Sequence, residues 1–276
     1  MPGIGFSLQA QYDRPITHVI PLLKDSGFSA VSPIWSPDFD LTALSTCVCG
    51  HGMAIQSLHA PHKNISLLWQ PDSPESSQVQ ANILLCLDSC KAFDVPIMVL
   101  HGWQGLKYTF PDTPLDFRFF DKMVEHAEKQ GVTVAFENLE GEEYLAALMN
   151  RYAHLPHIGY CWDSGHDHCY PHATDFLAAY GDRLIMTHLN DNLGLRDPGG
   201  IPSGADDLHF LPGDGNIDWD HAMAKLKKAK KQDILNFEFK VRSKSTNPHD
   251  LIYTQMNLEQ FISTAGQRAQ EIAKKA

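Results

Sequence analysis

An acid and an imidazole lie three residues apart in the stretch Ile158-Gly159-Tyr160-Cys161-Trp162-Asp163-Ser164-Gly165-His166. The apolar and aromatic residues at its start show no polar alternation, which is typical of a strand that is buried on both faces. Ser164 and Gly165 end this run abruptly, so we expect Asp163 and His166 where the strand leaves the core. A carboxylate and an imidazole at this spacing can point toward one small target.

Five other apolar runs end in the same kinds of side chain: His59, His101, Glu137, His188 and Glu238. Taken singly, a histidine there is most often a hydrogen-bonded structural residue, and a glutamate is most often a surface charge. Six successive runs that all end in this way need another explanation. Burying that many ionisable groups together costs too much free energy unless a cation neutralises them. Metal coordination therefore explains the pattern best.

These runs belong to an alternation of strands and helices that spans the chain. The predicted strands are residues 3–9, 28–35, 53–60, 95–103, 133–139, 158–163, 184–190 and 234–239. The clearest predicted helices are residues 78–93, 116–130, 173–180, 218–231 and 251–275. Amphipathic spacing and charges suited to the helix ends support them.

Eight strands alternating with helices, without a change of composition between them, predict an α/β fold with a single (β/α)8 TIM barrel over residues 1–276. A doubly wound sheet is the alternative. In a barrel the carboxyl ends of all strands surround one mouth, where the catalytic groups of this fold lie. The long loop 192–215 is rich in glycine and proline, and loops of that length are usually functional or disordered.

The composition limits the classes of protein. With 276 residues, 43% of them hydrophobic, the chain can bury a full core. No run of eighteen apolar residues and no signal-peptide pattern is present, so we expect a cytoplasmic protein without a membrane partner. The six cysteines are scattered, which favours reduced thiols. The net charge of -11 counts against a protein that grips nucleic-acid phosphates.

The residue types at the strand ends indicate the preferred ion. Glu137, Asp163, His188 and Glu238 form a mostly oxygen set with one imidazole and leave room for water or substrate. We therefore expect one divalent ion, Mn²⁺ in the first place, with Mg²⁺, Co²⁺ or Zn²⁺ able to replace it. Cys161 faces the same way as Asp163 on strand alternation, and we interpret it as a small core residue.

Asp207 and His209 lie two residues apart in the long loop, and on an extended segment their side chains point to the same side. They are candidates for a second metal site or for contact with a polar substrate. A loop held by its own Asx turns is the alternative that the sequence leaves open.

Several of these segments, in their order along the chain, resemble the xylose-isomerase-like TIM-barrel superfamily. This superfamily holds sugar isomerases and epimerases, inosose-processing enzymes and endonuclease IV. The segments are Glu137-Asn138, Asp163-Ser164-Gly165-His166, His188-Leu189-Asn190-Asp191-Asn192, Asp207-x-His209, Pro212-Gly213-x-Gly215 with Asp218-Trp219, and Glu238. The resemblance covers essentially the whole chain, and its motifs are specific to the superfamily but choose poorly among its members.

The resemblance to the ketose 3-epimerases of this superfamily implies roles for individual residues. The set Glu137, Asp163, His188 and Glu238 would bind Mn²⁺ or Co²⁺, and its two glutamates would also exchange protons with the substrate. Glu143 and His166 match substrate-contacting positions. Further candidates for substrate contact are His59, His101, Trp103, Asp207 and His209, and Trp35 and Trp69 join Trp103 as aromatic rings that can stack on a sugar face.

The resemblance to endonuclease IV implies a different metal site, with three zinc ions held by nine ligands. The matching residues here are His59, His101, Glu137, Asp163, His166, His188, Asp207, His209 and Glu238. Two features count against this function. Residues 194–205 stretch the passage from His188 to Asp207, and no cluster of basic and aromatic residues near the mouth is suited to holding a bent duplex.

We therefore expect a divalent-metal-dependent isomerase or epimerase of a sugar or related keto-polyol, acting by proton transfer through a metal-bound ene-diolate. Two alternatives stay open: an endonuclease IV-like AP endonuclease with a three-zinc site, and a metal-dependent dehydratase or lyase on a sugar-like keto substrate. The expected partner is a small sugar or polyol rather than a nucleic acid, and formation of a homo-oligomer stays open. No glycine-rich phosphate loop follows the last strands, which favours an unphosphorylated substrate.

Overall fold

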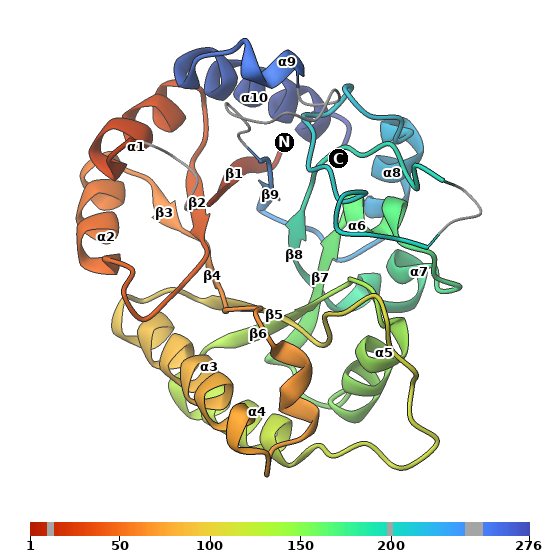
Figure 1. Ribbon diagram of the computed structural model, residues 1–276. Helices are drawn as coiled ribbons and strands as arrows, with labels where there is room; N and C mark the ends of the chain where they lie inside the picture. Colours follow the sequence, from red (N-terminus) through yellow and green to blue (C-terminus); the bar gives the residue numbers. More distant parts are fainter. Residues whose placement is uncertain (10–13, 198–200, 241–250) are drawn as a thin grey trace.

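The computed structural model describes residues 1–9, 14–197, 201–240 and 251–276, and within these residues parallel strands form a ring with helices around it (Figure 1). The strands are β1 (Gly3–Leu8), β2 (Ala30–Pro33), β3 (Ala54–Ile55), β4 (Ser57–His59), β5 (Ile97–His101), β6 (Thr133–Glu137), β7 (Ile158–Asp163), β8 (Leu184–His188) and β9 (Ile234–Phe237).

The ring consists of two runs of strands, and isolated β-bridges connect one run to the other. One run has the order β3-β2-β1-β9 and the other the order β4-β5-β6-β7-β8. Parallel bridges between Ile34 and His59 and between Leu189 and Phe237 connect the two runs. Because β3 and β4 are the two halves of one strand interrupted at Gln56, the ring has eight strand positions. The predicted single (β/α)8 barrel is confirmed.

The helices lie outside the strand ring (Figure 1). They are α1 (Ile16–Asp25), α2 (Leu41–Gly50), α3 (Pro74–Ala92), α4 (Arg118–Gln130), α5 (Glu142–Arg151), α6 (Ser164–Cys169), α7 (Phe176–Tyr180), α8 (Trp219–Leu226), α9 (Leu251–Thr254) and α10 (Leu258–Ala273), with short 3-10 helices η1 (Ile65–Trp69) and η2 (Gly181–Arg183). None of the described helices is long and apolar enough to cross a membrane.

Several predicted boundaries were wrong for local reasons. Helix α3 begins at Pro74 rather than at residue 78, because the Ser73 hydroxyl caps it and proline suits the first turn. The predicted helix 251–275 is two helices, and α10 starts anew where Asn257 and Gln260 form a capping box. Helix α7 begins at Phe176, after its cap Asp175, and α8 already ends at Leu226.

The interior of the barrel is filled beneath the mouth by a small apolar cluster. Val99, Ala135, Cys161 and Met186 lie in this cluster, one each from β5 to β8, and all are fully buried. Cys161 is therefore a core residue, as the strand pattern indicated. Two residues further along the same strands come His101, Glu137, Asp163 and His188. Since side chains of a strand alternate between its faces, these four point to the same interior, one level nearer the mouth.

We predict that Gly159→Ala in β7 destabilises the fold by about 1–3 kcal/mol, because an added methyl group overfills a closed space. A Cβ atom there would lie 2.0 Å from Ile185 Cδ1 and 2.6 Å from the carbonyl oxygen of Arg183. Urea unfolding followed by circular dichroism measures the change. Gly50→Ala is the matched control, since a Cβ atom at this last residue of α2 meets nothing within 4 Å. Equal stability of Gly159→Ala and the unmodified protein would contradict the packing argument.

Candidate metal centre

Acidic and imidazole side chains converge at the carboxyl ends of the strands. His59, His101, Glu137, Asp163 and His188 are the last residues of β4, β5, β6, β7 and β8, and Glu238 directly follows β9. The parallel register pairs His101 with Glu137 and Asp163 with His188. These six residues are all buried, with exposed fractions of at most 8%. The strand ends therefore place a dense set of ionisable groups inside the mouth.

The first set of groups, called here the central group, consists of Glu137, Asp163, His188 and Glu238. One ligand atom from each lies within 4.8 Å of the others. His188 Nδ1 is 3.1 Å from Glu137 Oε2 and 2.8 Å from Glu238 Oε2. His188 Nδ1 and both carboxylate oxygens of Glu137 are buried without a hydrogen-bond partner. Buried atoms of this kind, facing one another at short range, fit a divalent cation placed between them.

Two outer groups flank the central group. The first outer group is His59, His101 and Glu137, and the second outer group is His166, Asp207 and His209. In the first, His59 Nε2 lies 3.2 Å from His101 Nε2 and 3.3 Å from Glu137 Oε2. In the second, His209 Nε2 lies 2.8 Å and His166 Nε2 3.6 Å from Asp207 Oδ1. Glu137 belongs to the central and to the first outer group, and its Oε2 lies 3.1 Å from His188 Nδ1 and 3.3 Å from His59 Nε2.

Backbone carbonyls fix the orientation of three of the imidazoles. Nδ1 of His59 lies 2.7 Å from the Ala60 carbonyl oxygen, Nδ1 of His166 3.0 Å from that of Asn138, and Nδ1 of His209 3.2 Å from that of Glu238. A carbonyl oxygen can only accept, so Nδ1 donates in each case. In the neutral form of such a ring Nε2 carries the lone pair and faces the groups, as in rings that bind metal ions.

Without a cation, the imidazoles balance the buried carboxylates. Burial raises the pKa of Glu137, but His188 and His101 outweigh burial and hold that pKa well below its usual range. Burial lowers the pKa of His166, yet Asp163 and Asp207 raise it well above normal. Burial raises the pKa of Asp163 to about 6. A metal ion that enters must therefore displace protons from imidazoles.

Two asparagines hold Asp163 in place. Asn138 Oδ1 accepts from the Asp163 amide at 2.8 Å and from the Tyr160 hydroxyl at 2.7 Å, and its Nδ2 donates to the Asp163 carbonyl oxygen at 2.9 Å. Asn190 Nδ2 donates to both carboxylate oxygens of Asp163, at 3.2 and 3.0 Å. Both asparagines are fully buried. Their positioning role was missed from the sequence, where the signal was a polar amide directly after a strand.

The second outer group depends on a loop that Asp191 organises. Its carboxylate accepts from the amides of Asn192, Gly213 and Ile217 and from the Trp219 indole. An antiparallel bridge pairs Asp191 with Phe210, the residue after His209. The prediction of an extended Asp207–His209 segment was wrong at His209, whose φ of 49° is left-handed. The bend brings the His209 ring onto Asp207. In the same loop, Asp206 accepts from the amides of Ser203 and Arg196.

Other predicted substrate contacts lie apart from these groups. Glu143 is exposed in the first turn of α5 and accepts from the Tyr108 hydroxyl at 2.6 Å. Trp103 is half-buried and stacks on Tyr144, with ring centroids 4.2 Å apart. Trp35 and Trp69 are buried in the core. A substrate role for Glu143 and Trp103 stays a prediction.

His62 was not among the predicted site residues. Its ring stacks on His101 with centroids 5.5 Å apart and meets His59 edge-on at 5.9 Å. It is half-buried, and burial, followed by the charges of His101 and His59, lowers its pKa to about 4. His62 therefore lies at the edge of the first outer group, where it would contact an ion or molecule bound to that group.

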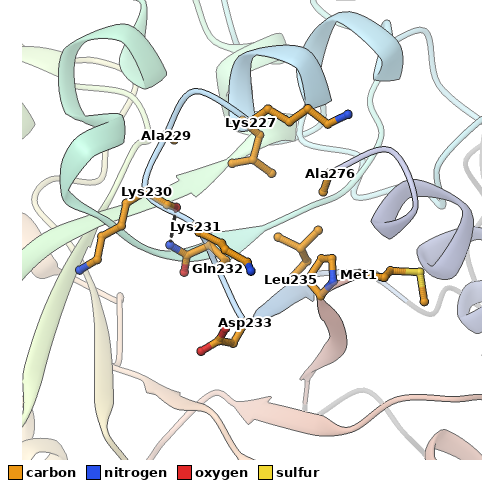
Figure 2. A pocket seen from close by; sticks show the side chains of 11 residues that line it. Met1, Lys227, Ala229, Lys230, Lys231, Gln232, Asp233, Leu235 and Ala276 are labelled. Carbon is orange, nitrogen blue, oxygen red and sulfur yellow. Dashed lines mark hydrogen bonds between the residues drawn. The ribbon is translucent and has the colours of Figure 1, made fainter.

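A cavity at the other end of the barrel is unsuited to the same chemistry. It measures about 450 Å³ and is lined by Met1, Leu235 at the start of β9, the chain end Ala276 and lysines 227, 230 and 231 (Figure 2). Asp233 is the acid among its lining residues. The cluster of acids and imidazoles lies instead at the carboxyl ends of the strands.

Comparisons with known proteins agree with the barrel. The family described as Xylose isomerase-like TIM barrel matches residues 20–259. The uncharacterized protein y4fM of Sinorhizobium fredii (strain NBRC 101917 / NGR234) is 28% identical over 305 aligned positions, which cover 94% of this chain and 93% of that protein.

Two solved structures show the same fold at low sequence identity. The D-allulose 3-epimerase of Methylomonas sp. in complex with D-allulose has a TM-score of 0.71 at 13% identity, covering 100% of this chain and 98% of that one. The IolI protein with a bound zinc atom has a TM-score of 0.67 at 16% identity, covering 99% of this chain and 96% of that one.

We predict that Asn138→Leu weakens divalent-metal binding by roughly tenfold to a hundredfold, the usual effect of losing a residue that orients a ligand. The substitution removes all three hydrogen bonds of the Asn138 amide, so Asp163 loses its fixed backbone position. Competition with a chelating dye measures the affinity. Asn150→Leu, at an exposed position of α5, is the matched control. Unchanged affinity in a folded Asn138→Leu protein would show that this amide does not position the site.

Proposed function

Because the chain belongs to the Xylose isomerase-like TIM barrel family, we propose that it is a divalent-metal-dependent isomerase or epimerase of a sugar or related keto-polyol. One observation carries the proposal: Glu137 and Glu238, from different strands, approach the same nitrogen of His188 from 3.1 and 2.8 Å. Two carboxylates around one ion-binding point are suited to moving a proton between two faces of a substrate. The expected substrate is a small molecule.

Glu137, Asp163, His188 and Glu238 would hold the ion. Three carboxylates and one imidazole form a mostly hard donor set, which favours Mn²⁺, with Mg²⁺, Co²⁺ or Zn²⁺ as substitutes. The bound ion would supply a Lewis acid that polarises a ketone oxygen and its neighbouring hydroxyl group. His188 would serve as ligand and not as base, because its Nδ1 lies 3.1 Å from Glu137 Oε2 and 2.8 Å from Glu238 Oε2, among the atoms that would hold the ion.

The glutamates perform the proton transfers. One glutamate takes the proton from the carbon next to the carbonyl group, which gives an ene-diolate. Return of a proton by the other glutamate to the opposite face gives the epimer, and return to the neighbouring carbon, with transfer of the hydroxyl proton between the two oxygens, gives the isomer. Gln9 Nε2 donates to Glu238 Oε1 at 3.1 Å and so orients that carboxylate. His166 would hold a substrate hydroxyl, and His59, His101, Asp207 and His209 are further candidates for substrate contact.

The names of similar structures support a sugar substrate. One is the D-allulose 3-epimerase, crystallised with D-allulose, and another is the 3-keto-D-glucoside 4-epimerase YcjR of E. coli. YcjR has a TM-score of 0.67 at 15% identity and covers 99% of this chain and 100% of that one. A dehydratase or lyase acting on a sugar-like keto substrate would begin with the same proton removal, and it differs in releasing water.

A second candidate function is metal-dependent hydrolysis of DNA at abasic sites. The observation that favours it is the division of nine residues into the central and two outer groups, which offer ligands for three ions. The net charge of -11 counts against binding a phosphate backbone. The isomerase or epimerase therefore remains the favoured proposal.

We predict that turnover of a ketose in deuterated water places solvent deuterium on the carbon next to the carbonyl group. Mass spectrometry or proton NMR of the product measures the label. The label follows from exchange of the glutamate-bound proton with solvent between removal and return. Product formed without solvent label would exclude proton transfer through these glutamates and leave a hydride shift.

We also predict that Glu137→Gln and Glu238→Gln each lose about a hundredfold or more in kcat, as expected for a general acid or base. Glu125→Gln is the control, because Glu125 is exposed on α4 and pairs only with Lys129 among the described residues. Full activity in either of the two site variants would contradict the assigned roles.

The second candidate has its own expected outcome. On the favoured account, abasic-site DNA stays intact in the presence of Zn²⁺ or Mn²⁺, while a ketose or inosose is converted. A nicking assay with a fluorescent duplex and a sugar-conversion assay, both on the same preparation, distinguish the two functions. Cleavage of the duplex without conversion of any ketose or inosose would overturn the proposed class of enzyme.

A further inference from the structure

The ammonium of Lys240 contacts the second outer group. Lys240 Nζ donates to Asp207 Oδ2 at 2.8 Å, and His209 Nε2 lies 2.9 Å from the same oxygen. The carboxylates of the three groups make several ion pairs with other described residues. Among these, the pair of Lys240 with Asp207 is the one that involves a lysine. The other ion pairs that the described residues make with these carboxylates involve imidazoles. The chain thus places a positive charge of its own on a carboxylate that could otherwise hold an ion.

The backbone holds Lys240 in this place. The residue between it and Glu238 is Phe239, which is fully buried against Phe6 and Phe237. With Phe239 directed into the core, the alternation of an extended segment turns Glu238 and Lys240 toward the mouth. The Lys240 amide donates to the His209 carbonyl oxygen at 3.3 Å, and His209 Nδ1 donates to the Glu238 carbonyl oxygen at 3.2 Å. These hydrogen bonds therefore fix the position of Lys240 relative to His209 of the second outer group.

We propose that Lys240 is the built-in cation of the second outer group and keeps a metal ion out of it. An ion bound to Asp207 would lie about 2 Å from a carboxylate oxygen, and therefore within a few ångströms of an ammonium that contacts the same carboxylate. Like charges at that range repel strongly in a largely buried site. Asp207 Oδ2 is also already occupied by Lys240 and His209.

The group then serves the substrate and not an ion. His166 and His209 are buried side chains whose Nε2 atoms face Asp207, and the ammonium of Lys240 adds a donor for substrate oxygens beside them. The inference rests on the proposed function only in taking the central group as the metal site. It distinguishes a site in which the second outer group binds substrate from a site in which that group binds an ion.

The test counts bound ions. Metal-free protein is dialysed against a fixed free concentration of Zn²⁺, and the same is done with Mn²⁺, before elemental analysis. Lys240→Met and Lys240→Gln should each bind one more ion per chain than the unmodified protein. Lys240→Arg, which keeps the charge, should bind the same number as the unmodified protein. The double variant Lys240→Met with Asp207→Asn should lose the additional ion.

Lys225→Met is the matched control. Lys225 also makes an ion pair at 2.8 Å, with Asp175, and its side chain is 27% exposed, against 23% for Lys240. This control should bind no additional ion. Equal metal content in Lys240→Met, Lys240→Gln and the unmodified protein, each shown to be folded by circular dichroism, would overturn the proposal. Three zinc ions per chain in the unmodified protein would overturn it as well.

The same measurement separates this inference from the proposed function. Glu238→Gln should lose the ion of the central group, whatever happens at Lys240. If Lys240→Met gains an ion but Glu238→Gln loses none, the central metal site is wrong and the role of Lys240 stands. If Glu238→Gln loses an ion but Lys240→Met gains none, the central site stands and the inference is wrong.

Discussion

The buried carboxylate of Glu137 is the charge on which the rest of the site depends. Only 2% of this residue is exposed, and its oxygens lie 3.1 to 3.5 Å from nitrogens of His59, His101, His166 and His188 without making a hydrogen bond. Removing a carboxylate from water costs several kcal/mol unless positive charge compensates it. Protonated imidazoles provide that charge in the protein alone, and a divalent ion would provide it in the loaded enzyme. Burying this carboxylate therefore costs free energy in the protein alone, and the same arrangement is suited to binding a divalent ion.

The register of the parallel strands brings these charged side chains together. Val99, Ala135, Cys161 and Met186 fill the interior one level below, and the next inward residues of their strands are His101, Glu137, Asp163 and His188. Parallel pairing sets these residues at the same height, so that small apolar side chains support an ionisable layer. The buried amides of Asn138 and Asn190 hold Asp163 in place by hydrogen bonds. Asp191 holds the loop that carries Asp207 and His209. Each of these polar residues compensates a backbone or carboxylate group that the closed mouth removes from water.

The sequence predicted the parts that depend on local pattern. Buried strands that end in Asp163, His188 or Glu137 were recognisable because apolar runs and an ionisable ending are both local signals. The interruption at Gln56, the left-handed bend at His209 and the contact of Lys240 with Asp207 depend on neighbours far along the chain, so no window of sequence contains them. His62 was missed for the same reason, since it follows β4 and stacks on His101 at the end of β5. The substrate role of Glu143 rests on resemblance and stays a prediction; in the structure Glu143 is exposed in the first turn of α5 and accepts a hydrogen bond from Tyr108.

We propose that one divalent ion binds between Glu137, Asp163, His188 and Glu238. Anomalous X-ray scattering can locate this ion in crystals of protein purified without chelator, with data collected on both sides of the manganese and zinc absorption edges. We expect one strong anomalous peak within bonding distance of all four side chains, and none between His166, Asp207 and His209. A peak confined to either outer group, with none among the four residues of the central group, would contradict it.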